Sequence, residues 1–260
     1  MIYLTGDMHG NFERILKKQR QKLPFVLKET DYVIVCGDFA LLWAKKDKEL
    51  AYNLELLSRL PFTLLWVDGN HEGFNLLEEY PVEIWNGGKV HHIIKDKLIH
   101  LMRGQVFNLE GKMFFTFGGA SSHDVSGGIL DKSNPAYPML RHEALKNGKP
   151  FRIRNIDWWE QELPTEEELE ESRTNLLKVG YQVDYVISHC ACTKIHKGIK
   201  AYYKADILTE YFEELEEKLK YTHWYFGHYH EDEQIDERHT VLYNQIIPIR
   251  LNEEYLLGDG

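Results

Sequence analysis

Five short clusters of polar residues along the chain contain the residue types that bind metal ions. They are Gly6-Asp7-Met8-His9-Gly10, Gly37-Asp38, Asp68-Gly69-Asn70-His71-Glu72, Ser188-His189-Cys190 and Gly227-His228-Tyr229-His230. Asp7 and His9 are two positions apart, so on an extended segment both side chains point to the same side and can share one ion. His228 and His230 repeat this spacing. A set of carboxylate, amide and imidazole ligands suits Mn, Fe, Zn, Co or Ni better than Ca.

The clusters offer more ligands than one ion can use. The candidates are Asp7, His9, Asp38, Asn70, His189, His228 and His230. Such a set suits two divalent ions that share a carboxylate. Two metal ions about 3.5–4 Å apart are the usual machinery for in-line displacement at phosphorus, because they stabilise both the attacking and the leaving oxygen. The residue types therefore predict a dinuclear metal centre for phosphoryl chemistry.

Glycines support this interpretation, since Gly6, Gly37, Gly69 and Gly227 each stand directly before a candidate ligand. A missing Cβ allows the tight turn and the close backbone approach that a crowded site needs. Taken singly, a Gly-Asp pair is typical of a turn, and a His-x-His pair occurs on many ordinary strands. The ordered set along one chain favours a site over these structural alternatives.

Apolar runs before the clusters predict buried strands at Ile2 to Thr5, Tyr32 to Cys36 and Thr63 to Val67. Helices are expected between these strands, at Asn11 to Lys22 and at Asp47 to Leu60. Strands that alternate with helices at this pace pair in parallel through right-handed crossovers. Because ligands bind at the carboxyl ends of such strands, we expect the polar clusters to converge at one edge.

The rest of the chain predicts a different layout. Short runs at Val90 to Ile94, Leu98 to Met102, Gln105 to Leu109 and Met113 to Phe117 predict a hairpin meander. Residues 121–161 show no clear period and predict a long excursion packed on the domain. Further strands are expected at Tyr185 to Ser188, Trp224 to Phe226 and Thr240 to Tyr243. One helix begins at the capping box of Thr165 and runs to about Lys178, and another runs from about Asp206 to Lys220. We expect one α/β domain over residues 1–260, with two sheets packed together and helices outside.

Composition limits the classes of function. The 260 residues carry a formal net charge of −10, which argues against a long nucleic-acid track because affinity for polyphosphate rests on Lys and Arg. The 3 Cys cannot build a disulfide framework, and we expect reduced, buried thiols. The N-terminus lacks the pattern of a secretory signal, and no apolar run is long enough for a membrane span. The expectation is a cytoplasmic protein without a membrane partner, whose oligomeric state is open.

From Asp7 to His230 the ordered motifs D-x-H, G-D, G-N-H-E, H and G-H-x-H resemble those of the calcineurin-like metallophosphoesterase superfamily. The resemblance implies a sandwich of two mixed β-sheets flanked by helices. It also implies a first metal held by Asp7, His9, Asp38 and His230, with Asp38 bridging to a second metal that Asn70, His189 and His228 complete. Two divalent ions are the implied cofactors, with Mn expected first and Fe, Zn, Co or Ni as alternatives.

The same resemblance implies catalytic roles for His71 and Glu72. His71 would lie just outside the metal shell and stabilise the transition state or protonate the leaving oxygen, while Glu72 would orient it. The nucleophile would be a water or hydroxide on the metals. The implied function is hydrolysis of a phosphomonoester or phosphodiester of a small molecule or nucleotide.

Departures from the family's patterns bear on the alternatives. The D-x-H and G-N-H-E motifs look like those of the Ser/Thr protein phosphatases, which follow G-D with Asp and Arg in G-D-x-x-D-R-G. Here Gly37-Asp38 is followed by Phe39-Ala40-Leu41-Leu42, so a phosphoprotein phosphatase is disfavoured, and the acidity disfavours a nuclease. A non-catalytic scaffold would be expected to have lost ligands or His71. Every candidate ligand and His71 are present.

Several other polar residues have two interpretations. His91 and His92 are adjacent on a strand, so they face opposite sides and we expect structural roles. In the excursion, His123-Asp124 and Arg141-His142 could reach over the metals. Arg152 and Arg154 are the best basic candidates for an anionic substrate, or else part of a solvated face. Cys190 and Cys192 are either buried small residues or thiols that touch the site.

Overall fold

A seven-stranded mixed sheet forms one half of the body of the protein. The computed structural model describes residues 1–43 and 47–249. The strand order is β15 (Ile246–Pro248), β1 (Ile2–Thr5), β2 (Tyr32–Val35), β3 (Thr63–Trp66), β6 (Leu98–Leu101), β5 (Gly88–Ile94) and β4 (Val82–Trp85). Strands β1, β2 and β3 are parallel, as the alternation of strands and helices predicts. Strand β6, which was expected only within a hairpin meander, pairs parallel to β3, while β15, β5 and β4 pair antiparallel to their neighbours.

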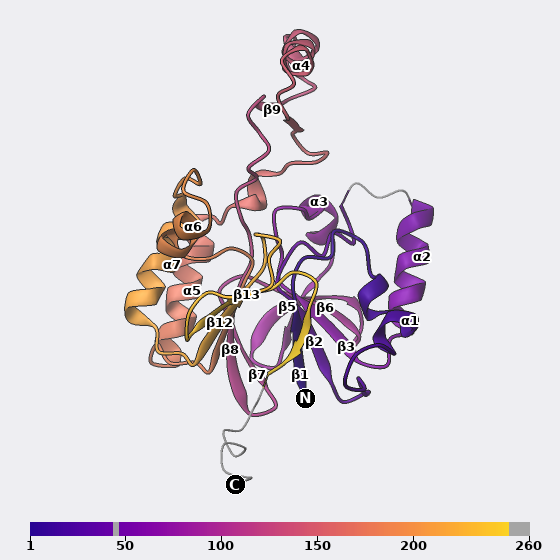
Figure 1. Cartoon of the computed structure of the whole chain (residues 1–260), viewed down its shortest axis with the longest axis vertical. Coiled ribbons are helices and arrows are strands. Elements are labelled where there is room, and N and C mark those ends of the chain that lie inside the picture. The colour runs from indigo at the N-terminus through magenta and orange to yellow at the C-terminus, as the bar shows by residue number, and fades with distance from the viewer. Residues whose placement is uncertain (44–46, 250–260) are drawn as a thin grey trace.

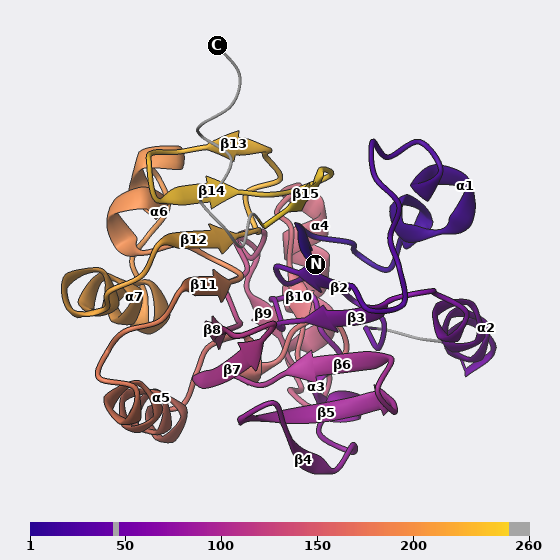
Figure 2. The same cartoon turned by 90° about the horizontal axis from the view of Figure 1, so that it is seen from below.

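A second mixed sheet of six strands packs against the first (Figure 2). Its order is β13 (Glu233–Gln234), β14 (His239–Val241), β12 (His223–Phe226), β11 (Tyr185–Ser188), β8 (Lys112–Phe117) and β7 (Gln105–Leu109). The four central strands are parallel, and β13 and β7 are antiparallel edges. The resulting pair of mixed sheets with flanking helices is the α/β architecture that the sequence predicts.

Alternate residues of the central strands face different layers. In β1, Ile2 and Leu4 belong to the apolar core between the two sheets, whereas Tyr3 belongs to the core under the outer helices. In β3, Leu65 likewise belongs to the core between the sheets, and Leu64 belongs to the core under the outer helices. Because neighbouring side chains of a strand point to opposite faces, strands that are apolar at every position are buried on both sides. This is why these short runs contain almost no polar residue.

Helices cover the outer face of each sheet (Figure 2). On the first sheet lie α1 (Lys17–Arg20) and α2 (Asp47–Ser58), and on the second lie α5 (Glu166–Lys178), α6 (Thr193–Ile199) and α7 (Ile207–Lys218). The capping box predicted at Thr165 is present, and Asp206 caps α7 in the same way. Among the described residues, no helix combines the length and the apolarity that crossing a membrane would need.

The helix predicted over 11–22 is wrong, because only a short 3-10 turn (Glu13–Ile15) and α1 form there. Leu16 between them is extended, with a ψ of 158°. The Arg14 side chain donates to the backbone oxygens of Asp7 and Tyr243 and to the hydroxyl of Thr5. Contacts to distant parts of the chain, and not the helical period, therefore determine this segment.

The single meander predicted over residues 90–117 is also wrong. The strands form two hairpins, and β5–β6 belongs to the first sheet whereas β7–β8 belongs to the second. The chain crosses between the sheets at Gly104, whose φ is +68° and whose N–H donates to the Thr116 carbonyl at 2.8 Å. Apolar alternation predicts a strand, but it does not indicate which sheet supplies the partner.

The excursion contains more regular structure than its sequence predicts. Its elements are β9 (Ile129–Leu130), α4 (Tyr137–Lys146), β10 (Arg152–Ile153) and a 3-10 turn at Glu160–Glu162, with β9 and β10 paired in parallel. Figure 1 shows α4 at the far end of an arm that extends away from both sheets, so the excursion is not packed flat on the domain as expected. The two stems of the arm, around residues 121–124 and 152–162, contact the polar clusters of the body.

Candidate metal centre

The five polar clusters all follow strands of the two parallel cores. Asp7 and His9 follow β1, Asp38 follows β2, and Asn70 follows β3 in the first sheet. In the second sheet, His189 follows β11, and His228 and His230 follow β12. The parallel strands of both sheets end on the same side of the sandwich. The chain therefore brings the candidate ligands together from positions more than 200 residues apart.

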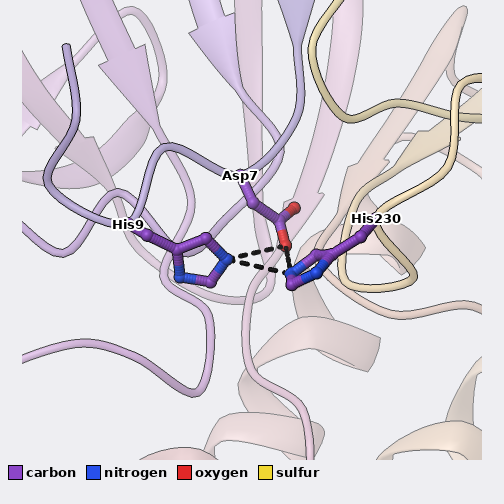
Figure 3. A group of neighbouring side chains, drawn as sticks. All are labelled: Asp7, His9 and His230. Atoms are coloured by element: carbon purple, nitrogen blue, oxygen red, sulfur yellow. Dashed lines mark hydrogen bonds and ion pairs between the residues drawn. The ribbon is translucent and has the colours of Figure 1, made fainter.

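Asp7, His9 and His230 form the first group of possible ligands (Figure 3). Oδ2 of Asp7 lies 3.2 Å from Nε2 of His230 and 3.6 Å from Nε2 of His9, and the two Nε2 atoms are 2.9 Å apart. Oδ2 of Asp7 is buried, and within the described part of the chain none of its contacts has the geometry of a hydrogen bond. A buried carboxylate oxygen that faces two imidazole nitrogens fits a cation, because such an oxygen is otherwise costly to bury.

Asp38 belongs to both other groups, one with Asp7 and His189 and one with His9 and His71. Its Oδ1 lies 3.3 Å from Nε2 of His189, and its Oδ2 lies 3.6 Å from Nδ1 of His9. Burial raises the pKa of Asp38, but the attraction of His189 and His71 outweighs it and holds the pKa well below its usual value. Asp38 is therefore an anion that lies between the two sets of nitrogen donors.

Asn70 is held by a chain of hydrogen bonds from the excursion. Its Oδ1 lies 3.3 Å from Nε2 of His189, while its Nδ2 donates to Oγ of Ser122 at 3.3 Å. Ser122 in turn donates from Oγ and from its backbone N to the two carboxyl oxygens of Glu162, at 2.9 and 3.0 Å. Burial raises the pKa of Glu162 to about 8. Sequence reasoning missed Ser122 and Glu162, because nothing in the sequence distinguishes them from neighbouring Ser and Glu residues.

His228 lies beside these groups but is in none of them among the described residues. Its ring is 5.0 Å from that of His189, and its backbone N–H donates to Oδ1 of Asp7 at 2.9 Å. Its Nε2 lies 3.0 Å from Nε2 of His123, which stacks on Tyr203. Because Nε2 is engaged by the excursion, Nδ1 is the atom of His228 that remains for an ion.

His71 lies at the edge of the centre. Its backbone N–H donates to Oδ1 of Asp38 at 2.7 Å, and its Nδ1 lies 2.5 Å from Oδ2 of the same residue. Its Nε2 lies 2.9 Å from an Nη2 of Arg152, and its ring contacts that of Trp43 edge-on. Asp38, Arg152 and Trp43 thus fix the orientation of the imidazole.

Glu72 contacts the turn after Asp38, and among the described residues its carboxyl has no hydrogen bond to the His71 side chain. Its Oε1 accepts from the backbone N–H groups of Phe39 and Ala40, at 2.9 and 3.4 Å, and the carboxyl is buried. Glu72 therefore holds the turn after Asp38 and not the neighbouring imidazole. Burial, with Asp38 and Asp68 nearby, raises the pKa of Glu72 well above its usual value.

The backbone of the centre is strained at four candidate ligands. His9, Asp38, His228 and His230 have φ values of 47°, 47°, 70° and 56°. Residues other than Gly rarely adopt this left-handed region, and such residues cluster at functional sites. Gly37 shows how crowded the turn is, because a Cβ there would overlap the ring of His189.

The remaining candidates lie elsewhere or have structural roles. Arg141 and His142 are on α4, at the far end of the arm (Figure 1). His91 is buried and stacks on His100, as a structural role predicts. Cys190 and Cys192 are buried, and burial raises the pKa of both thiols, to about 12 for Cys192, which favours the packing role over reactivity.

The comparison with protein families agrees with the sequence motifs. A family model described as calcineurin-like phosphoesterase matches residues 1–232. Among solved structures, a phosphopantetheinyl hydrolase from Mycobacterium tuberculosis is 15% identical, with a TM-score of 0.44 and coverage of 99% of this chain and 98% of that chain. The comparison with curated protein sequences found no match.

Proposed function

The chain belongs to the calcineurin-like phosphoesterase family, and we propose that it is a phosphoesterase dependent on two divalent metal ions. It would hydrolyse a phosphomonoester or phosphodiester of a small molecule or nucleotide. The observation that carries the proposal is the geometry of the buried Asp38 carboxylate, whose Oδ1 lies 3.3 Å from Nε2 of His189 and whose Oδ2 lies 3.6 Å from Nδ1 of His9. A carboxylate shared in this way is what a dinuclear centre requires. We further propose that residues 1–260 form one domain, of which 44–46 and 250–260 lie outside the described residues.

The two proposed ligand sets share Asp38. The first ion would be held by Asp7, His9, Asp38 and His230, and the second by Asp38, Asn70, His189 and His228. The unpartnered Oδ2 of Asp7 supports the first set, and the amide oxygen of Asn70 beside Nε2 of His189 supports the second. Nitrogen and oxygen donors in this mixture suit Mn first, with Fe, Zn, Co or Ni as alternatives.

The roles of the chain's own groups follow from these contacts. Two divalent ions, when bound, supply a nucleophile from water near neutral pH and offset the charge of the phosphoryl group. Asp38 accepts the Nδ1 proton of His71, and Nε2, which here accepts from Nη2 of Arg152, is the atom that would take up a proton and pass it to the leaving oxygen. Asp38 would thereby hold both ions and orient the imidazole of His71.

The experiment that tests the proposal compares metal-free and Mn²⁺-restored protein on a monoester, a diester and a cyclic nucleotide. We expect turnover of at least one of them only with metal, and a fall in kcat of about 100-fold or more in His71→Ala. His142→Ala is the matched control, because His142 is exposed on α4 and remote from the centre. If wild type binds two ions and turns over none of the three substrates, the enzyme proposal is wrong and the scaffold alternative stands.

A further inference from the structure

The stem of the excursion brings one arginine to the edge of the metal centre. Arg152, on β10, places Nη2 2.9 Å from Nε2 of His71, and its side chain is only 14% exposed. We propose that the Arg152 guanidinium binds a non-bridging oxygen of the substrate's phosphoryl group and so forms a phosphate subsite that the excursion supplies. This inference rests on the proposed function, since it assumes that the phosphoryl group lies against the same centre.

The guanidinium of Arg152 is held before any ligand arrives. Asp124, on the other stem of the excursion, accepts from Nε at 2.9 Å and from Nη2 at 2.6 Å. The guanidinium carbon lies 5.4 Å from the centre of the Trp43 ring, which also contacts His71. A guanidinium group whose orientation is fixed in this way loses little conformational entropy when it binds an anion.

Within the described part of the chain, one nitrogen of the Arg152 guanidinium, Nη1, remains free. Two of the N–H groups of Arg152 go to Asp124 and one approaches His71, whereas Nη1 has no hydrogen-bond partner among residues 1–43 and 47–249. Nη1 therefore keeps two donors, on the guanidinium that already touches the catalytic imidazole. Charge-assisted hydrogen bonds from such donors are the usual way in which proteins bind phosphate.

Arg14 and Arg154 differ from Arg152 in the groups that their guanidinium groups contact. Arg14 approaches Asp7, but its guanidinium donates to the backbone oxygens of Asp7 and Tyr243, so it braces the chain. Arg154 pairs with Glu160 and lies over the ring of Trp158. Arg154 contacts none of the proposed ligands within the described part of the chain, and it thus provides a matched control two positions from Arg152.

The test is calorimetric titration of the Mn²⁺-loaded protein with inorganic phosphate, for wild type, Arg152→Gln, Arg152→Lys and Arg154→Gln. We expect the Kd for phosphate to rise about tenfold or more in Arg152→Gln, from the loss of charge-assisted hydrogen bonds. Arg152→Lys should recover part of the affinity for phosphate, because lysine keeps the positive charge. The recovery should be incomplete, because lysine lacks the planar set of guanidinium donors. Arg154→Gln should bind phosphate as wild type does. Melting temperature and bound metal are measured for each variant.

The outcomes separate this inference from the proposed function. If Arg152→Gln binds phosphate as tightly as wild type, or if metal-loaded wild type binds no phosphate, the subsite is wrong. Loss of bound metal in Arg152→Gln would also overturn it, because the effect would then act through the centre. If wild type turns over no phosphoester while Arg152→Gln still weakens phosphate binding, the enzyme proposal fails and the subsite stands.

Discussion

At the scale of single residues, the centre depends on groups that hold the ligands as much as on the ligands. Asn70 presents Oδ1 toward His189 and donates from Nδ2 to Ser122, and Ser122 donates twice to Glu162. Such supporting hydrogen bonds fix the orientation of a ligand and typically change metal affinity 10- to 100-fold. The supports come from the two stems of the excursion, so the arm contributes to the site that it borders.

Ser122→Ala should therefore weaken the second metal site without removing any proposed ligand. The amide of Asn70 loses the acceptor for Nδ2 and can turn away from His189, so we expect a Kd for the weaker of two Mn²⁺ ions about tenfold higher. Metal titration by calorimetry measures this change. The control is Ser121→Ala, because Oγ of Ser121 bonds Asp206, which caps α7, and it has no contact with Asn70. Equal Mn²⁺ affinity in Ser122→Ala and wild type would contradict the supporting role.

At the scale of elements, the sequence predicted the central strands to within a residue or two, including those that precede ligands. The expected bounds of β1 and β11 match those of the structure, because an apolar run buried on both faces ends where Gly-Asp or Ser-His begins. The stems of the excursion could not be predicted in the same way. Glu162 and Arg152 act through contacts to residues 40 and 81 positions away, which no local period encodes.

The same limit applies to the hairpin β5–β6. His91 of β5 and His100 of β6 are paired across the strands, and their rings stack with 5.4 Å between centres. His100 in turn lies 3.3 Å from Asp68, which forms a buried ion pair with Arg103. The sequence indicated a structural role for His91, but this buried polar network depends on a register that only the assembled sheet defines.

The burial of His91 should make folding sensitive to acid. Burial, with repulsion from His100, lowers the pKa of His91 to about 4 from a usual value of 6.5. Below pH 6.5 the unfolded chain binds a proton that the folded protein excludes, so stability falls as the pH drops from about 6.5 toward 4. Between pH 7 and 5, this one group should lower the free energy of unfolding of the metal-free protein by about 2 kcal/mol.

Urea unfolding of the metal-free protein at pH 7 and at pH 5 measures the effect. His91→Phe keeps a ring against His100 but removes the titrating group, so its loss of stability between the two pH values should be smaller than that of wild type by about 2 kcal/mol. His142→Phe, on the exposed face of α4, should leave the difference unchanged. An identical difference in wild type and His91→Phe would show that the group does not contribute.

At the scale of the whole molecule, the proposed metal centre joins the two halves of the sandwich. Asp7, His9, Asp38 and Asn70 follow strands of the first sheet, and His189, His228 and His230 follow strands of the second. Ions that bind both sets at once would link the sheets only in the folded chain. Metal binding should therefore stabilise the entire body, because a ligand that binds only the native state shifts the folding equilibrium.

Removal of metal should accordingly lower the melting temperature of the body as one cooperative unit. At a free Mn²⁺ concentration about 100 times the Kd of a site, each ion contributes about 3 kcal/mol, which corresponds to a rise of about 5–10 °C per ion for a chain of this size. Scanning calorimetry of chelator-treated and Mn²⁺-restored protein measures this rise. Asp38→Asn should show little or none of it, since it removes the charge that both ions share. If elemental analysis finds two ions bound and the transition does not move, the ions do not bridge the sheets, and the ligand sets proposed here are wrong.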